Sequence, residues 1–215
     1  MRPIQKVLMT ILWGLTVLIM VSVIGAGLWK KRESEPLTAA EQQQQQQQQQ
    51  LTVQEKSQLP ETIGPAPQFD LIDQDSKPVT LKSLAGKPWI ADFVFTHCAG
   101  PCPRMTGQLA ALQKELPANV QFVSFSVDPE RDTPAVLKDY AGKFSADESR
   151  WRFLTGTKDA IFAVARGMMI TASPHSTRFI LIDGEGNIRN TYESDDAERM
   201  AALKHDAAAL AGEKH

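Results

Sequence analysis

The sequence has few cysteines and no excess of positive charge. Cys98 and Cys102 are the only two cysteines in 215 residues. Two are too few for a disulfide scaffold, so a pair this closely spaced predicts a reactive or metal-binding site. The formal net charge is −2, which gives no support to nucleic acid as a partner. Apolar residues make up 42% of the chain and charged residues 22%, as in a globular protein.

The N-terminal region lacks acidic residues altogether, since none precedes Glu33. No charge of either sign lies between Val7 and Trp29, a stretch long enough to span a bilayer with some tilt. A cleaved signal peptide would have a shorter apolar core and a clearer exit of small residues. We therefore expect residues 1–32 to be a retained anchor, with a transmembrane helix that contacts the membrane through residues 7–29. Basic residues flank this helix on both sides, so the positive-inside rule does not decide its orientation.

The next segment, residues 33–62, has few large apolar side chains and contains nine consecutive glutamines at 42–50. Such a tract cannot bury enough apolar surface to offset the entropy lost on ordering. We expect a disordered, Gln-rich linker between the anchor and a folded domain.

Residues 63–215 show the alternation of strand and helix patterns that is typical of an α/β domain. We expect two hairpins, one at 69–73 and 79–81 and the other at 178–183 and 188–192. Further strands are expected at 89–95, 120–127 and 151–154. Two helices are expected to end at Leu116 and Phe144, and two more to cover 158–167 and 197–211. This order of elements predicts a central mixed β-sheet flanked by helices.

The two cysteines lie where the strand at 89–95 gives way to a helix. Cys98 is in the connecting loop and Cys102 is at the opening of the helix. The unpaired N–H groups and the positive dipole end of a helix N-terminus favour thiolate over thiol. Because a thiolate is both a nucleophile and a ligand for soft metals, this stretch suits thiol exchange and copper binding alike.

Three segments together resemble one protein family. They are FTHCAGPCP at 95–103, SVDPERDTP at 126–134, and His175-Ser176 ahead of LID at 181–183. In this order and at these separations they are similar to the Sco (SenC) family of copper-handling cytochrome c oxidase assembly proteins. The match runs from about Ile63 to Tyr192. Asp92, six residues before Cys98, also resembles the buried aspartate of thioredoxins, so the resemblance implies a thioredoxin-like fold.

The family resemblance implies a copper site formed by Cys98, Cys102 and His175. Two thiolates and an imidazole suit Cu(I) in a three-coordinate site, and an added oxygen would suit Cu(II). Zinc accepts the same ligands, but a structural zinc site usually has a fourth protein ligand, and none is evident. The implied partner is the copper-centre subunit of cytochrome c oxidase or another apo-cuproprotein. We expect the domain on the periplasmic or extracytoplasmic side of the inner (cell) membrane.

Several neighbours of the cysteines allow two interpretations. His97 adjoins Cys98, and since neighbouring side chains diverge in extended chain, we expect it at the surface or outside the coordination shell. Asp132 is either the side-chain cap of the following helix or, with Asp128 from the preceding turn, a carboxylate near the mouth of the site. If Asp92 is buried, a raised pKa would let it accept a proton from Cys102 during thiol exchange.

Two functions from different classes therefore stay open. One is a membrane-tethered copper chaperone for the binuclear copper centre of cytochrome c oxidase. The other is an enzyme, a thiol–disulfide oxidoreductase that reduces the cysteines of an apo-metalloprotein, with Cys98, Cys102 and Asp92 as its catalytic residues. His175 separates the two hypotheses, because a copper site gains from an imidazole that thiol exchange does not need.

Overall fold

The computed structural model describes residues 18, 20, 43–44, 60–168 and 177–212. The chain divides into two compact units, Met1–Glu55 and Lys56–His215, and the architecture below belongs to the second. In the parts of the chain that the structure describes, no helix is both long and apolar enough to cross a bilayer. Nearly all of the expected anchor at 1–32 and of the linker at 33–62 lies outside those parts.

The second unit is built on one six-stranded mixed sheet, as the alternation of elements predicts. The strand order is β1-β8-β7-β4-β5-β6. The strands are β1 (Gly64–Pro65), β4 (Trp89–Val94), β5 (Gln121–Ser126), β6 (Trp151–Leu154), β7 (Arg178–Ile182) and β8 (Asn187–Glu193). The pairs β4–β5 and β5–β6 are parallel, whereas β4–β7, β7–β8 and β8–β1 are antiparallel. Strand β4 therefore lies between parallel and antiparallel neighbours.

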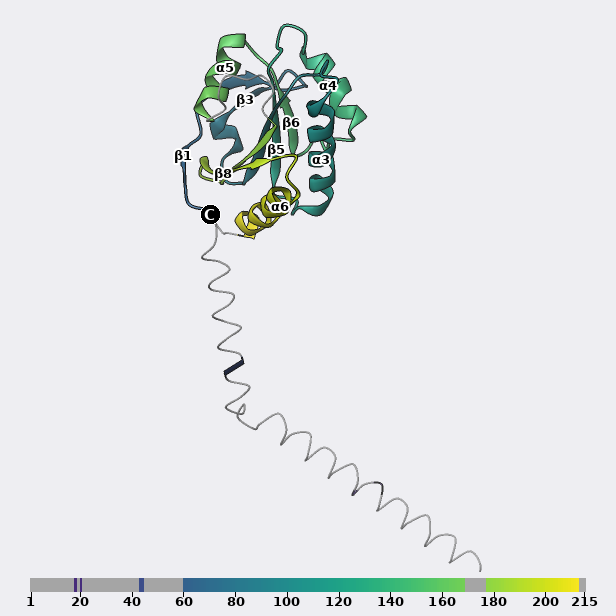
Figure 1. The fold of residues 1–215 in the computed structure, drawn as a ribbon, viewed down its shortest axis with the longest axis vertical. Coiled ribbons are helices and arrows are strands. Elements are labelled where there is room, and N and C mark those ends of the chain that lie inside the picture. Colours follow the sequence, from purple (N-terminus) through teal and green to yellow (C-terminus); the bar gives the residue numbers. More distant parts are fainter. Residues whose placement is uncertain (1–17, 19, 21–42, 45–59, 169–176, 213–215) are drawn as a thin grey trace, which may run out of the picture. The chain divides into compact units, whose positions relative to one another are not determined.

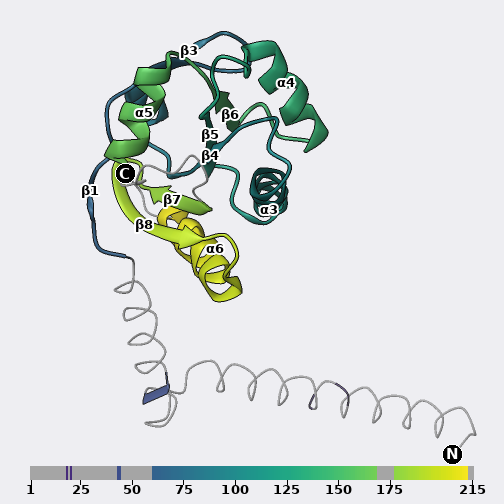
Figure 2. The same cartoon turned by 45° about the horizontal axis from the view of Figure 1, so that its top comes forward.

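Helices cover both faces of this sheet (Figures 1 and 2). On one face α3 (Pro101–Glu115), α4 (Pro134–Lys143) and α6 (Ala197–Gly212) pack in a core with Ile90 of β4. On the other face α5 (Lys158–Gly167) packs in a core with Ala91, the next residue of β4. All six residues of β4 are buried because successive side chains point to opposite, covered faces.

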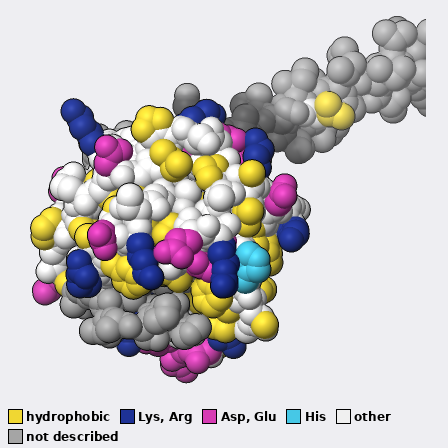
Figure 3. Space-filling model, turned by 90° about the horizontal axis from the view of Figure 1, so that it is seen from above, with side chains coloured by type: hydrophobic (Ala, Val, Ile, Leu, Met, Phe, Trp, Pro, Cys, Tyr) yellow, Lys and Arg dark blue, Asp and Glu magenta, His cyan; other side chains and the backbone are white. Residues whose placement is uncertain are grey.

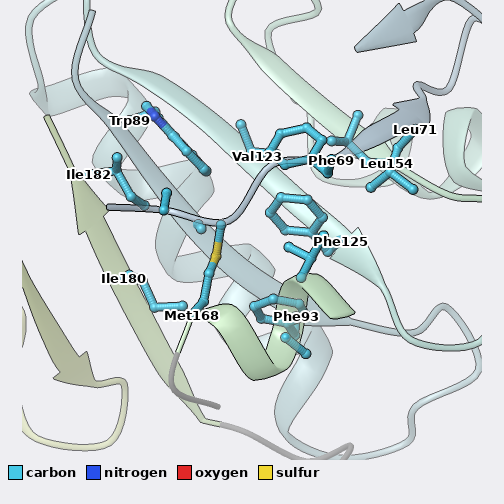
Figure 4. Close-up of a cluster of buried hydrophobic side chains, with 14 of the residues drawn as sticks. Phe69, Leu71, Trp89, Phe93, Val123, Phe125, Leu154, Met168, Ile180 and Ile182 are labelled. Atoms are coloured by element: carbon cyan, nitrogen blue, oxygen red, sulfur yellow. The ribbon is translucent and has the colours of Figure 1, made fainter. Parts of the chain in front are cut away.

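Aromatic side chains fill much of the core on the α5 face, as Figure 4 shows. Phe93 stacks on Phe125 with 5.1 Å between ring centroids, and Phe69 meets Phe125 edge-on at 5.5 Å. Met168 lies beside Phe93 and Ile180 and is buried there (Figure 4). These contacts pack the core on this face of the sheet near the carboxyl end of β4.

A separate hairpin of β2 (Asp70–Ile72) and β3 (Pro78–Thr80) protects the edge of the sheet at β6. Its buried Gln74 accepts a hydrogen bond from the N–H of Phe153 and donates one to the carbonyl of Trp151. Backbone bonds between Ile72 and Thr155 extend the pairing. The hairpin thus occupies hydrogen-bonding groups that an open edge strand would expose.

The predicted elements agree with the observed ones to within a few residues. Two short elements were not predicted from the sequence, β1 and the 3-10 helix η1 (Leu81–Leu84). Strand β1 has only two residues and exists through its pairing with β8. The first turn of η1 is fixed by reciprocal hydrogen bonds between Thr80 and Ser83. Neither element is long enough to show a hydrophobic period.

Candidate thiol and metal site

The topology brings three chain segments to one edge of the sheet. Parallel strands β4 and β5 end there at Val94 and Ser126, and the connections to α3 and α4 begin. Antiparallel β7 starts at the same edge, since its register pairs Ile180 with Ala91. In α/β sheets, ligands bind at the carboxyl ends of the parallel strands. The cysteine loop therefore lies at the edge where a site is expected.

The structure confirms the positions predicted for the cysteines. Helix α3 begins at Pro101, so Cys98 is in the loop before it and Cys102 is in its first turn. Gly100 is the N-cap and offers no side-chain cap. Both cysteines are free, with Cys98 8% and Cys102 2% exposed, and they cluster with Val94. The pair is thus reduced, close together and almost enclosed.

The two thiols differ in acidity because they play opposite roles in one hydrogen bond. Burial by itself raises the pKa of Cys98. Hydrogen bonds from the Cys102 thiol and from the N–H groups of Cys102 and Gly100 lower this pKa by more than burial raises it. The net pKa of Cys98 is therefore lowered. Burial, together with the hydrogen bond to Cys98, raises the pKa of Cys102 to about 12. Cys98 is therefore the more acidic thiol of the pair, and Cys102 retains its proton.

Asp92 lies in the middle of β4 with no exposed surface. Neither of its carboxylate oxygens has a hydrogen-bond partner. Burial raises the pKa of Asp92 to about 7, and the hydroxyl of its register partner Ser124 opposes the shift without reaching hydrogen-bond geometry. The charge of Asp92 in turn contributes to the raised pKa of Cys102. Asp92 is therefore buried as expected and electrostatically coupled to the thiol that keeps its proton.

Two further polar residues lie beneath the cysteines and were not predicted. Thr106 of α3 donates to the carbonyl of Cys102 at 3.0 Å, and its oxygen is 3.0 Å from the hydroxyl of Tyr140 on α4. Because Thr106 has one hydrogen, already used on Cys102, Tyr140 is the donor to Thr106. Both side chains are buried. Their hydrogen bonds connect the first turn of α3 with α4. Thr106 and Tyr140 are 34 positions apart, and no sequence motif links them.

Asp132 does not cap α4. The N-cap is Thr133, without a side-chain hydrogen bond. The carboxylate of Asp132 is wholly buried and accepts from the N–H of Thr96 at 3.1 Å, from the Thr96 hydroxyl at 2.5 Å and from the Ser126 hydroxyl at 2.6 Å. The prediction of a helix cap was wrong because the loop folds the side chain inward, where charge-assisted hydrogen bonds satisfy it. Asp132 joins the cysteine loop to the end of β5.

The neighbours His97 and Asp128 lie nearer the surface. The side chain of His97 is 59% exposed, with Nδ1 3.1 Å from the Thr96 hydroxyl and 3.9 Å from Asp132. This placement agrees with the prediction of a surface position. Asp128 is a turn residue whose N–H donates to Ser126 and whose carboxylate pairs with Arg131 at 3.6 Å.

A complete metal site does not lie within the described ranges. Among those residues, no three His, Cys, Asp or Glu side chains come together in a way that could hold a metal ion. The predicted third ligand, His175, lies outside them. The two thiols that the structure does bring together are the ligand type that Cu(I) prefers, and their donor set fits a soft metal.

The surface carries charges of both signs. On the face shown in Figure 3, Lys and Arg side chains are interspersed with Asp and Glu, and apolar side chains lie singly or in small groups between them. Among the described residues of that face, no broad field of one sign is seen that would attract a strongly charged partner.

The family model for SCO1/SenC matches residues 56–209 of this chain. The SCO1 protein homolog of Bacillus subtilis is 38% identical over 137 residues, which are 58% of this chain and 71% of that protein. The solved structure of BsSco, described as having a disulfide switch and as a member of the Sco family of cytochrome c oxidase assembly proteins, is 32% identical. Its TM-score is 0.63, over 72% of this chain and 98% of BsSco.

The structure of Bradyrhizobium japonicum ScoI, solved with copper bound, is 28% identical with a TM-score of 0.55, over 65% of this chain and 98% of ScoI. These likenesses confirm the thioredoxin-like α/β fold of the Sco proteins. With the family match over most of the folded unit, they show that this chain belongs to the SCO1/SenC family.

Proposed function

We propose that this protein is a membrane-tethered copper chaperone that delivers copper to the binuclear copper centre of cytochrome c oxidase during assembly. The observation that carries the proposal is the pair of free, nearly enclosed thiols at the start of α3, one of them with a lowered pKa. A thiol with a lowered pKa beside a second thiol is a ready ligand set for Cu(I). Family relatives solved with copper bound support copper as the cargo.

His175 is proposed as the third ligand. Chain connectivity supports it, because three residues span at most about 11 Å and Arg178, three residues later, starts β7 at the edge where the cysteine loop begins. An imidazole suits both Cu(I) and Cu(II). Cys98, Cys102 and His175 would then hold one copper ion, with the proton of Cys102 released on binding.

The tether is the uncharged stretch at 7–29, which has the length of a membrane span. We propose a single pass through the inner membrane with the folded unit on the periplasmic or extracytoplasmic side. There the recipient would be the copper-centre subunit of the oxidase or another apo-cuproprotein.

A second candidate function is thiol–disulfide exchange, favoured by the split in thiol pKa and by Asp92. The Cys98 thiolate would attack a disulfide in the partner and form a mixed disulfide. Cys102 would pass its proton to Asp92 and attack Cys98, which releases the reduced partner and leaves a Cys98–Cys102 disulfide. Two electrons pass from this pair to the partner. The disulfide switch described for BsSco supports this candidate.

Titration with Cu(I) against a competing chelator tests the chaperone proposal. The reduced full chain should bind one copper ion, and the chain oxidised to the Cys98–Cys102 disulfide should bind none, since the disulfide removes both thiolate ligands. Equal copper retention by the oxidised chain would contradict the proposed ligand set. Absence of binding in the reduced chain would leave thiol exchange as the preferred function.

A further inference from the structure

The exposed imidazole of His97 is held by a chain of hydrogen bonds that fixes its tautomer. Asp132 is buried and, as a carboxylate, only accepts, so the hydroxyl hydrogen of Thr96 points to it over 2.5 Å. The oxygen of Thr96 is then an acceptor for His97, 3.1 Å away. From this network we assign the ring hydrogen of His97 to Nδ1.

The assignment leaves Nε2 of His97 without a hydrogen, as a lone-pair donor on a side chain that is 59% exposed. Histidines that bind metals usually donate their other ring N–H to a carboxylate, a carbonyl or a water, which fixes the ring and its tautomer. Here the hydroxyl of Thr96 takes that place, supported by the buried charge of Asp132.

The position of His97 adds a second observation. It directly precedes Cys98, a thiol that is only 8% exposed. A copper ion that arrives from solvent or from a partner therefore meets the exposed imidazole and the nearly covered thiol on one short loop. Imidazole nitrogen is a good copper ligand.

We propose that His97 is an entry ligand for copper, which takes Cu(I) through Nε2 and passes it to Cys98. The inference rests on the proposed function. On loading, a Cu–N bond to His97 forms as the ligand of the copper donor leaves. A Cu–S bond to Cys98 then forms as the Cu–N bond breaks. Any proton on the thiol goes to water. Copper stays Cu(I) throughout, so the transfer needs no oxidant or reductant. Unloading is the same path reversed.

An entry ligand changes rates and leaves the equilibrium alone. In the full chain, His97→Ala should slow both the uptake of Cu(I) and its removal by the chelator bicinchoninate by about tenfold, a modest barrier increase. Affinity should stay within about twofold of the parent, because a transient ligand affects both rates equally. The matched control is His205→Ala, since His205 is 52% exposed on α6 with its Nδ1 3.1 Å from Asp206. This control should leave both rates unchanged.

A second variant tests the support of the ring. In Asp132→Asn the amide can donate to Thr96, whose hydroxyl hydrogen is then free to turn to Nδ1 of His97 and move the ring hydrogen to Nε2. The ¹⁵N shifts of His97 should report this change of tautomer, and copper uptake should slow as in His97→Ala. Thr96→Val, which lacks the hydroxyl, should also slow uptake.

The outcomes separate this inference from the proposed function. Unchanged rates in His97→Ala would overturn the entry ligand while the parent still binds copper. A tenfold loss of affinity in His97→Ala would overturn it too, because His97 would then be a resident ligand. A parent chain that binds no Cu(I) would refute the chaperone function and the entry ligand together.

Discussion

Two buried aspartates flank the cysteines, and the protein treats them in opposite ways. Asp132 accepts three hydrogen bonds, from Thr96 and Ser126. Asp92 accepts none, and burial raises its pKa to about 7. Both side chains are completely buried. The same functional group at the same depth is therefore a structural anchor in one place and a titrating group in the other.

The difference shows that burial alone does not fix what a carboxylate does. A buried charge costs several kcal/mol unless hydrogen bonds or an opposite charge compensate for it. At Asp132 the loop supplies these donors, and the charge can hold the cysteine loop in place. At Asp92 no donor is supplied, so the group exchanges a proton near neutral pH, beside a thiol that must lose one.

Both aspartates are expected to serve the thiol pair, so removal of one thiol should have the strongest effect. Cys98→Ser should abolish both copper binding and the reduction of a model disulfide, because it removes the attacking thiolate and a ligand. His175→Ala should weaken copper binding by about tenfold or more and leave disulfide reduction largely intact. Chelator competition and a disulfide reduction assay measure the two activities. Copper affinity unchanged in His175→Ala would favour the oxidoreductase hypothesis.

The partnerless state of Asp92 predicts a pH effect of definite sign. Its folded pKa of about 7 lies above the unfolded value of 3.8, so the folded state binds the extra proton between these values. Stability from this group is therefore present below about pH 4 and falls as the pH rises to about 7, by on the order of 4 kcal/mol. Asp92→Asn should lack this fall and be the more stable variant at pH 8. Urea unfolding of both reduced proteins from pH 4 to 8 measures it, and parallel stability curves would contradict the raised pKa.

Substitution of Asp132 should destabilise the protein, whereas Asp92→Asn should stabilise it at pH 8. Asp132→Ala leaves three donors unpaired in the interior and should cost about 3 kcal/mol at pH 7. Asp132→Asn keeps an acceptor oxygen and should cost clearly less. Urea unfolding at fixed pH compares the two. If Ala and Asn behave alike and cost nothing, Asp132 does not hold the cysteine loop.

Both aspartates belong to the folded unit, which should stay folded when the N-terminal region is removed. Deletion of residues 1–32 should change the stability of the domain by less than about 0.5 kcal/mol, because the predicted anchor adds nothing to its core. Circular dichroism and urea unfolding of the truncated protein measure this. A loss of secondary structure would contradict the division into anchor, linker and domain.

Local pattern made most of the fold predictable. Strand β6 at Trp151–Leu154 and helix α5 at Lys158–Gly167 have the predicted bounds, because continuous apolar runs and helical periods persist across them. The cysteine loop was predictable for the same reason, since a strand ends and a helix begins around it. The motifs at 95–103 and 126–134 lie at the ends of β4 and β5 and in the connections that follow, and the family match confirms the resemblance.

The contacts around the site were not predictable in this way. Asp132 and Thr96 are 36 residues apart, and a helix cap was the local explanation for Asp132. The contact of Tyr140 with Thr106 joins two helices over 34 residues. No periodicity encodes such pairs, because they depend on which loops the parallel pairing of β4 and β5 brings to one edge.

Backbone preferences and apolar periods act over a few residues, so they are enough to predict an α/β domain with two thiols at a helix start. The tertiary structure, in contrast, sets the chemistry of the groups around those thiols. It assigned the lowered pKa to Cys98, left Asp92 without a partner and turned Asp132 inward. Acidity and hydrogen bonding depend on burial and on neighbours from distant segments, and folding alone supplies both.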